Sequence, residues 1–335
     1  MSKTCIPKGY QPALSLYETQ SAIGATKRAF EDNLSAALNL KRVSAPLFVD
    51  PETGLNDDLN GVERPVSFDI AETGEVAQVV HSLAKWKRMA LHKYGFHPGE
   101  GLYTDMNAIR RDEEMDNLHS IYVDQWDWEK VITREDRQVE YLKATVKTIV
   151  GAVCDTLDAV KAQYPQIPVT LARDVSFVTT QELEDAYPKL SPKERENAYL
   201  KEHKTAFIMQ IGDLLKSGQK HDGRAPDYDD WALNGDIVFW NDILGQAFEV
   251  SSMGIRVDAA SLDAQLTKAG CDDRRVLPFH RMLLSEELPL TMGGGIGQSR
   301  LCMLLLGKAH IGEVQVSLWD PATKEACMAA GIELL

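Results

Sequence analysis

The chain has 335 residues, of which 44% are hydrophobic and 26% charged, a composition typical of a soluble globular protein. No apolar run approaches the roughly 18 residues of a membrane helix, and the first residues, MSKTCIPKGYQP, lack the apolar core of a secretory signal, so we expect a cytoplasmic protein with no membrane partner. The net charge is −14 and the basic residues are scattered, which argues against nucleic acid as a partner.

Residues 13–40 are predicted to form a long helix. Apolar side chains recur there at steps of seven and four, so they share one helix face, which we expect to pack on the body of the protein or on a second subunit. These side chains are Leu16, Ile23, Phe30, Leu34 and Leu38. Pro46 interrupts the next run, RVSAPLFVD, and predicts an edge strand or an interface, because proline has no amide hydrogen to donate to a sheet.

Turn-forming and acidic residues fill positions 51–64, which predicts a loop. The next two runs, PVSFDI and EVAQVV, alternate as strands do and predict a hairpin. Ser82 stands where a helix N-cap is expected, and Gly95 stands where that helix would end.

Farther along the chain, the clearest helix spans residues 137–163, and Ser191 opens another helix with a capping box. Runs typical of strands are HSIYVDQWDWE, AFIMQIG, DIVFW and QAFEV. Strands and helices come in mixed order, so the predicted fold class is α+β, with a mostly antiparallel sheet flanked by helices. No repeat or linker divides the chain, which predicts one domain over residues 1–335.

Polar side chains alternate along HSIYVDQWDWE. On a strand, Gln125, Asp127 and Glu129 share one face. They either line a pocket or face water on a half-exposed sheet. Considered by itself, this segment favours the second interpretation, because antiparallel sheets often have one solvated face.

Arg110 follows a strand-like segment in GLYTDMNAIRRDEE. A guanidinium at the end of a strand offers a planar, permanently charged fork to a phosphate. The alternative is a surface arginine paired with Asp112 or Glu113.

Two carboxylates in the C-terminal half are candidate magnesium ligands. Asp236 begins DIVFW, and Glu249 follows in QAFEVSSMGIR, where we expect it to share a strand face with Ser251. Mg²⁺ takes oxygen ligands, so carboxylates on neighbouring strands can hold it. Two unrelated exposed acids are the alternative.

Glycine stands at positions 293, 294, 295 and 297, followed by Arg300 and an apolar run that predicts a buried helix. Glycine allows a backbone to approach a ligand closely, and a helix N-terminus favours negative charge. The pattern is neither a P-loop nor a dinucleotide fingerprint, so by itself it is weak evidence.

In this order, the features resemble the catalytic core of class II aminoacyl-tRNA synthetases, most closely the aspartyl and asparaginyl enzymes. Ser82 and Lys87 resemble a serine and a lysine of the aspartyl enzymes, but Ala84 replaces their glutamine, so amino-acid recognition must differ in part. Longer strings resemble ammonia-dependent asparagine synthetase of the A type over nearly the whole chain: HSLAKWKR, GEGLYTDM, YVDQWDWE, HDGRAPDYDDW, LNGD, FEVSSMGIRVDA and GGGIGQSRLCMLLL.

The resemblance implies a homodimer, with the helix at 13–40 and the Pro46 segment near its interface. It implies an enzyme that binds ATP, L-aspartate and ammonia, with Mg²⁺ as cofactor. The product would be L-asparagine, formed through a β-aspartyl-adenylate with release of AMP and pyrophosphate.

The site residues that the resemblance implies fall into four groups. The aspartate-binding group is Ser82, Lys87, Gln125, Asp127, Ser251, Ser252 and Arg256. The nucleotide-binding group is Arg110, Asp229, Glu249, Gly295 and Arg300, and the metal ligands are Asp236 and Glu249. The catalytic group is Arg110, Lys87 and Asp57.

Asp57 is the residue expected to bind ammonium and take a proton from it. Asp58 and a merely solvated acidic loop are the alternatives.

Three other functions fit parts of the pattern. A tRNA-charging enzyme would carry an anticodon-binding barrel, and we expect none before Ser82. A non-catalytic paralogue would tolerate the loss of groups such as Arg110 and Arg300, which are present. A glutamine-dependent synthetase would use a cysteine at its processed N-terminus, where Ser2 stands, so ammonia is expected to be the direct nitrogen donor.

Overall fold

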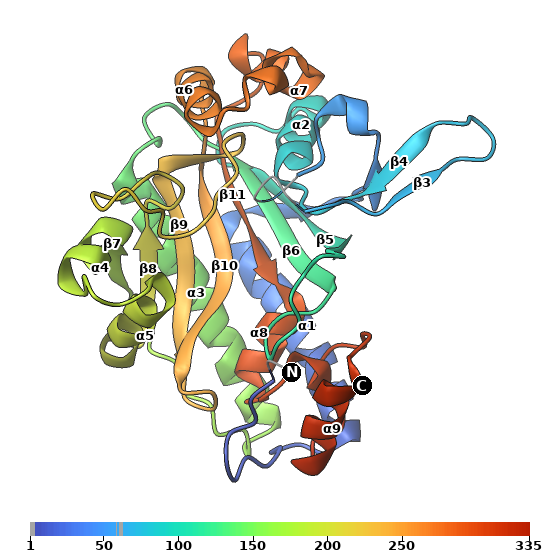
Figure 1. Ribbon diagram of the computed structural model, residues 1–335, viewed down its shortest axis with the longest axis vertical. Helices are drawn as coiled ribbons and strands as arrows, with labels where there is room; N and C mark the ends of the chain where they lie inside the picture. Colours follow the sequence, from blue (N-terminus) through green and yellow to red (C-terminus); the bar gives the residue numbers. More distant parts are fainter. Residues whose placement is uncertain (1–3, 58, 60–62) are drawn as a thin grey trace.

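The computed structural model describes residues 4–57, 59 and 63–335, and an eight-stranded sheet forms its centre (Figure 1). The strand order is β1-β5-β6-β11-β10-β9-β8-β7. The two outermost pairs are parallel and every pair between them is antiparallel, which confirms the predicted α+β class. The strands are β1 (Leu40–Arg42), β5 (Gly101–Ile109), β6 (Tyr122–Val131), β7 (Ser176–Thr179), β8 (Thr205–Met209), β9 (Asp229–Asn241), β10 (Gln246–Arg256) and β11 (Thr291–Gly297).

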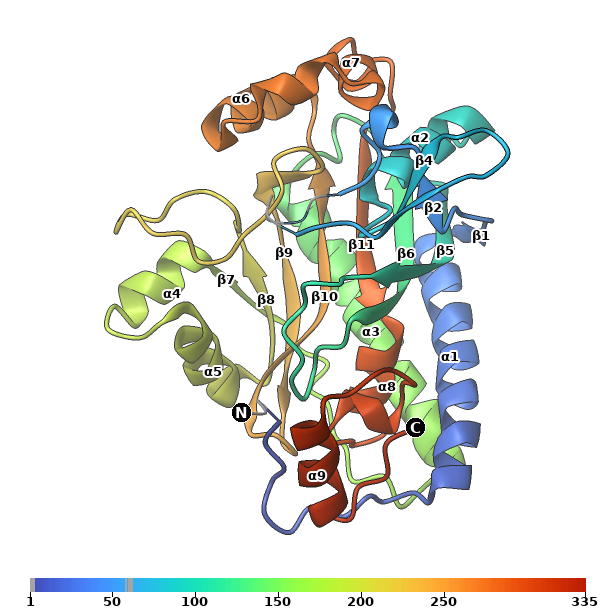
Figure 2. The same cartoon turned by 45° about the vertical axis from the view of Figure 1, so that its right-hand side comes forward.

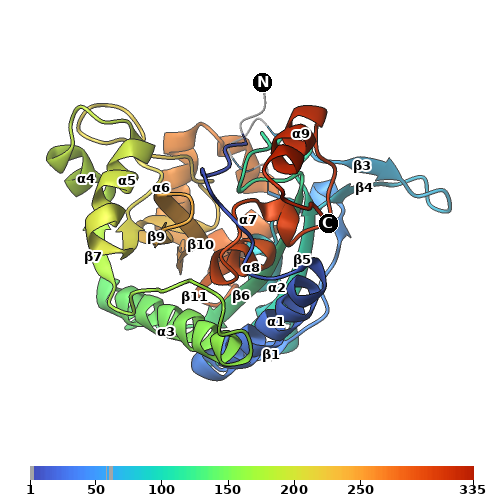
Figure 3. The same cartoon turned by 90° about the horizontal axis from the view of Figure 1, so that it is seen from below.

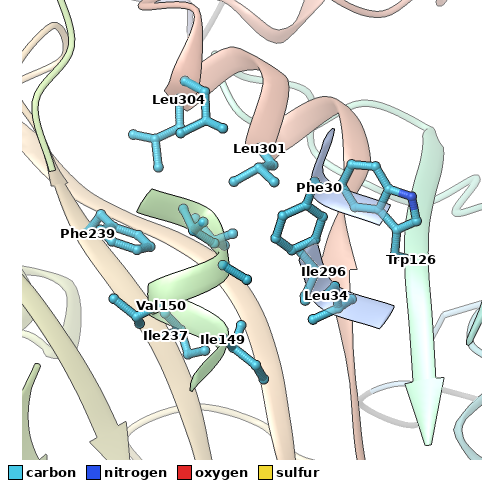
Figure 4. Close-up of a cluster of buried hydrophobic side chains, with 14 of the residues drawn as sticks. Phe30, Leu34, Trp126, Ile149, Val150, Ile237, Phe239, Ile296, Leu301 and Leu304 are labelled. Carbon is cyan, nitrogen blue, oxygen red and sulfur yellow. The ribbon is translucent and has the colours of Figure 1, made fainter. Parts of the chain in front are cut away.

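Three helices cover one face of this sheet. α1 (Leu16–Leu38) and α3 (Val139–Gln163) lie side by side along it (Figure 3), and α8 (Gln298–Leu305) contacts α1 and β6. Their apolar side chains meet those of the sheet in the main core, which contains Phe30, Trp126, Ile149, Ile237, Ile296 and Leu301 (Figure 4). On the opposite face, Ala206, Ile208 and Val238 pack against Leu183 and Leu200 in a second apolar cluster. The part of that face on β6, β10 and β11 carries the polar side chains that line a pocket.

The remaining described helices are α2 (Ala84–Tyr94), α4 (Thr180–Ala186), α5 (Pro192–His203), α6 (Ala259–Ala269), α7 (Pro278–Leu284) and α9 (Pro321–Ala329). Short 3-10 turns lie at Pro51–Thr53, Asp272–Val276 and Ile311–Glu313. Among the residues that the structure describes, no helix has both the length and the apolar character needed to span a membrane.

The predicted N-terminal helix is confirmed, but its buried face differs at the start. Phe30, Leu34 and Leu38 are buried as expected, whereas Leu16 is 45% exposed. Thr19 continues the buried face instead. A step of seven falls about 20° short of two full turns, so a stripe extended by sevens drifts off the packed face.

A second, three-stranded sheet of order β2-β4-β3 holds the predicted hairpin, which projects from the body in Figure 2. Its strands are β2 (Phe48–Val49), β3 (Ser67–Asp69) and β4 (Val76–Val79). The segment with Pro46 leads into β2, an edge strand, as predicted.

The helix expected after Ser82 begins one residue later than predicted. Leu83 is its N-cap, and Ser82 Oγ instead accepts a hydrogen bond from the Ala84 amide at 3.1 Å. Gly95 ends α2 in the left-handed conformation, as expected. Ser82 is therefore not the N-cap, although its hydroxyl still accepts from the first amide of α2.

Candidate active site

A pocket of about 450 Å³ opens on the polar face of the sheet. Its walls come from α2, from the loops after β5 and β8, and from β6, β10 and β11. It brings together most of the residues singled out from the sequence: Asp57, Ser82, Lys87, Arg110, Gln125, Asp127, Asp229, Glu249, Ser252, Arg256, Gly295 and Arg300. Two others, Asp236 and Ser251, are not among the residues that line it.

Successive side chains of strand β6 point alternately into the pocket and into the core. Gln125 and Asp127 line the pocket, whereas Trp126 and Trp128 are fully buried in the core. Glu129 is also fully buried. The water-facing alternative for this strand is therefore wrong, because its polar side chains are enclosed by α2 and by neighbouring strands.

Two buried cations form one ion-pair network on this face. Arg256 Nη2 donates to Glu129 Oε2 at 2.7 Å, and its Nη1 donates to Asp229. Lys87 reaches in from α2, donates to Asp127, and lies 3.7 Å from Glu129 Oε2. Burial opposes ionisation of Glu129, but Arg256 and Lys87 outweigh it and hold the pKa of this carboxyl below its ordinary value.

The glycine run forms β11, a strand between β6 and β10 that the sequence did not predict. A Cβ on Gly293 would lie 1.9 Å from Glu129 Oε2, and one on Gly295 would lie 2.4 Å from Gln125 Oε1. Each glycine therefore makes room for a charged or polar side chain of the site.

A β-bulge in β10 changes which serine faces the pocket. Val250 is an extra residue between Glu249 and Ser251 in the pairing with β9. Ser251 consequently stands opposite Ile237, on the core face, and is 1% exposed. The expectation that Glu249 and Ser251 share a face is wrong, because an inserted residue shifts the alternation by one position. Ser252 takes that place, and its Oγ donates to Glu249 Oε1 at 3.1 Å.

Asp236 and Glu249 lie on neighbouring strands, and Ser252 stands opposite Asp236. Burial, opposed by Arg224 and reinforced by Glu249, raises the pKa of Asp236. Burial disfavours the ionised form of Glu249 as well, but nearby cations led by Arg300 outweigh it and lower its pKa. Two neighbouring carboxylates supply the hard oxygen ligands that Mg²⁺ takes. The described residues hold no cluster of three or more metal-ligating side chains, so water and phosphate oxygens would complete the shell.

Arg110 is the least compensated cation of the pocket. It forms no ion pair with any residue in the described part of the chain, and its Nη2 makes one long hydrogen bond, 3.4 Å, to the His81 carbonyl. Asp112, the expected surface partner, binds Arg64 instead. Arg300 is only weakly paired, because its Nη1 lies 3.8 Å from Glu249 Oε2. These two guanidinium groups create a site for an anion.

Asp57 lies at the edge of the pocket and is 3% exposed. Its Oδ1 accepts a hydrogen bond from the Leu59 amide at 3.0 Å. Tyr228 also lines the pocket, and burial and then the charge of Asp57 raise the pKa of its phenol. Asp58, the alternative to Asp57, lies outside the described residues.

Among the pocket residues that sequence reasoning missed are Arg224 and Tyr228. Arg224 Nη2 donates to Asp236 Oδ1 at 2.6 Å. The Arg256 guanidinium lies 5.7 Å from the ring centre of Tyr228, within range of a cation–π contact. Both residues lie in the string HDGRAPDYDDW, where a lone arginine among acids was the available signal.

Solved structures with a similar fold are tRNA synthetases. Asparaginyl-tRNA synthetase from Entamoeba histolytica aligns over 90% of this chain and 67% of its own, with a TM-score of 0.63 and 12% identity. The enzyme from Pyrococcus horikoshii, complexed with asparaginyl-adenylate, aligns over 96% of this chain and 76% of its own, with a TM-score of 0.63 and 15% identity. The chain therefore has the class II aminoacyl-tRNA synthetase fold, and at this identity the likeness concerns the fold alone.

Sequence comparisons are more specific. A family described as aspartate–ammonia ligase matches residues 17–331. A protein of that name from Ruminiclostridium cellulolyticum is 62% identical over the full length of both chains, and one from Clostridium perfringens is 60% identical over the full length of both. The chain belongs to the aspartate–ammonia ligase family. It is an enzyme, a ligase of asparagine biosynthesis.

Proposed function

We propose that the pocket forms L-asparagine from L-aspartate, ammonia and ATP through a β-aspartyl-adenylate, releasing AMP and pyrophosphate. The observation that supports this most directly is the presence of two kinds of cation in one pocket. Arg110 lacks an ion-pair partner among the described residues and suits a polyphosphate. Lys87 and Arg256 are fixed in a buried network that suits a small charged ligand.

The nucleotide would bind along the open side of the pocket. Arg110 would contact the α-phosphate and stabilise the negative charge that gathers there in the transition state. Arg300 would contact the outer phosphates or stack on the adenine, next to Gly295 and Glu249. Asp229 is engaged by Arg256, so we propose that it acts by orienting that guanidinium.

Aspartate would bind over the ion-pair network. Lys87 and Arg256 would attract its two carboxylates, helped by the hydroxyls of Ser82 and Ser252. Asp127 and Gln125 would accept hydrogen bonds from its ammonium group. Because these groups are already held by one another, little ordering is needed when the substrate arrives.

The chemistry follows from the leaving group. A carboxylate is a poor acylating agent, because oxide would have to leave. The β-carboxylate oxygen therefore attacks the α-phosphorus and displaces pyrophosphate, which leaves AMP as the later leaving group. Ammonia then attacks the carbonyl carbon of the activated β-carboxyl group, Cγ, the bond from that carbon to the AMP oxygen breaks, and one proton leaves the new amide nitrogen.

Asp236 and Glu249 would hold Mg²⁺, which supplies charge neutralisation at the phosphates when it is bound. Asp57 would bind ammonium and take the proton that nitrogen must lose. Asp57 is 3% exposed and lines the pocket, which supports that role.

We also propose that residues 1–335 act as one catalytic unit in a cytoplasmic homodimer, with α1 and the segment around Pro46 near the interface. Light scattering on the purified chain tests this assembly. A mass that stays that of one chain at all concentrations would contradict it.

The decisive experiment uses aspartate labelled with ¹⁸O in its β-carboxylate, together with ATP, Mg²⁺ and ammonium. The proposed route gives asparagine and transfers label to AMP. Formation of ADP, with the label in inorganic phosphate, would indicate an acyl-phosphate route instead. Aspartate labelled in the α-carboxylate is the control, because transfer from that group is the signature of tRNA charging, and we expect none with or without tRNA.

A further inference from the structure

Arg224 lines the pocket and contacts Asp236, the one of the two candidate metal-binding carboxylates that does not line it. It comes from the loop between β8 and β9, and its side chain is only 9% exposed. Its Nη2 donates to Asp236 Oδ1 at 2.6 Å, and its Nε lies 3.8 Å from Asp229 Oδ2. That buried Nε has no hydrogen-bond partner among the described residues, so the guanidinium is incompletely satisfied where it lies.

The carboxylate that Arg224 holds is one of the two proposed magnesium ligands. Glu249, the other, already has Arg300 within 3.8 Å. For Asp236, Arg224 is the one ion-pair partner that the described residues provide. The Asp236 carboxylate thus binds the Arg224 guanidinium in the ligand-free protein and would bind a divalent ion when the metal is present. The two cations compete, because they cannot bind Oδ1 at the same time.

We propose that Arg224 is a phosphate-binding residue that masks Asp236 until the nucleotide arrives. This inference rests on the proposed function. A nucleotide that carries its metal offers two exchanges: the ion replaces the guanidinium at Asp236, and the phosphate oxygens receive the displaced guanidinium, whose planar fork suits them. A free divalent ion offers only the first exchange and leaves Arg224 buried with only the long 3.8 Å contact to Asp229, which is costly. The metal therefore enters with the nucleotide and not before it.

A purely structural ion pair would behave differently, and the chain contains a matched example. Arg195 and Glu184 pair at 3.4 Å on α5 and α4, and the Arg195 side chain is also 9% exposed. Neither residue lines the active-site pocket. Arg195→Gln therefore controls for the general effect of removing a buried cation.

The test measures binding of Mn²⁺ by electron paramagnetic resonance, with and without ATP and in the absence of aspartate. In the wild-type protein we expect weak binding of Mn²⁺ alone and tight binding with ATP. Arg224→Gln is expected to bind Mn²⁺ alone about tenfold more tightly, because the competing charge is gone, and to bind ATP about tenfold more weakly. Arg195→Gln is expected to change neither by more than about twofold.

Two results would overturn the proposal. Unchanged binding of Mn²⁺ alone by Arg224→Gln means that the arginine masks nothing. Unchanged or tighter ATP binding means that the guanidinium does not pass to the phosphates. If Arg224→Gln does not fold, Arg224→Lys decides: it keeps the charge but not the fork, so Mn²⁺ binding alone stays weak while ATP binding falls, and unaltered ATP binding overturns the inference.

Failure of the proposed function gives a different pattern. A wild-type protein that binds no Mn²⁺ even with ATP contradicts the metal site itself. In the double variant Arg224→Gln/Asp236→Asn, the tightened binding of Mn²⁺ alone is expected to disappear. Persistence of that gain would mean that the ion binds elsewhere, and would reject Asp236 as a ligand.

Discussion

The Arg256 guanidinium and the Glu129 carboxylate meet at 2.7 Å across strand β11, directly over Gly293. Arg256 belongs to β10 and Glu129 to β6, so the two side chains span a strand that contributes no side chain at this point. The ion pair over which aspartate is proposed to bind therefore depends on one missing methyl group.

Gly293→Ala is expected to break this arrangement. The added Cβ would lie 1.9 Å from Glu129 Oε2 and 2.6 Å from Arg256 Nη2. We expect the free energy of unfolding to fall by roughly 2–4 kcal/mol and aspartate binding to be lost. Urea denaturation and calorimetry measure both effects. Gly151→Ala in α3, where an added Cβ meets nothing within 4 Å, is the control and should stabilise by about 0.5–1 kcal/mol.

Arg110→Ala is expected to separate activity from stability. Because the guanidinium has no ion-pair partner among the described residues, its loss should change the free energy of unfolding by less than about 0.5 kcal/mol. Its loss at the α-phosphate should lower kcat/KM for ATP by about 10²–10³-fold. Steady-state kinetics check this, with the exposed neighbour variant Arg111→Ala as the control. Equal activity in the two variants would refute the assignment.

Substitution of the two adjacent serines is expected to affect activity differently. Ser252→Ala removes a hydroxyl from the pocket and from Glu249, so we expect activity to fall by roughly tenfold. Ser251→Ala removes a buried hydroxyl that has no hydrogen-bond partner among the described residues, so activity should stay close to wild type. Parallel kinetic assays decide, and the reverse pattern would contradict the bulged register of β10.

Asp57→Asn is expected to block the second half of the reaction more than the first. Adenylate formation, followed as exchange of labelled pyrophosphate into ATP, should fall by less than about tenfold, whereas asparagine formation should fall by about 10²–10⁴-fold. Asp50→Asn, in the same loop but exposed and outside the pocket, is the control. If both half-reactions fall equally, Asp57 is not the ammonium base.

Stability is expected to fall at mildly acidic pH because of His310. Burial lowers the pKa of His310 from 6.5 to about 4, so the folded protein holds this ring neutral. The unfolded chain takes up the proton first, and the free energy of unfolding should therefore decrease as the pH falls from 6.5 to about 4, by at most roughly 3 kcal/mol. Denaturation at several pH values tests this. His310→Gln should lose that part of the slope, while replacement of the exposed His97 should not.

Features that depend on near neighbours in the chain could be predicted from the sequence. The apolar period of α1 and α3, the hairpin of β3 and β4, and the alternation of Asp127 with Trp126 and Trp128 all follow from side chains within a few positions of one another. The family strings also identified most of the residues that line the pocket, since such strings record which side chains occur together.

The tertiary structure alone decided how these side chains meet. The bulge at Val250 turns Ser251 into the core, β11 brings Gly293 beneath a buried ion pair, and Arg224 holds Asp236 from another loop. Each of these features depends on a partner far away in the chain, and local periodicity contains no information about such a partner.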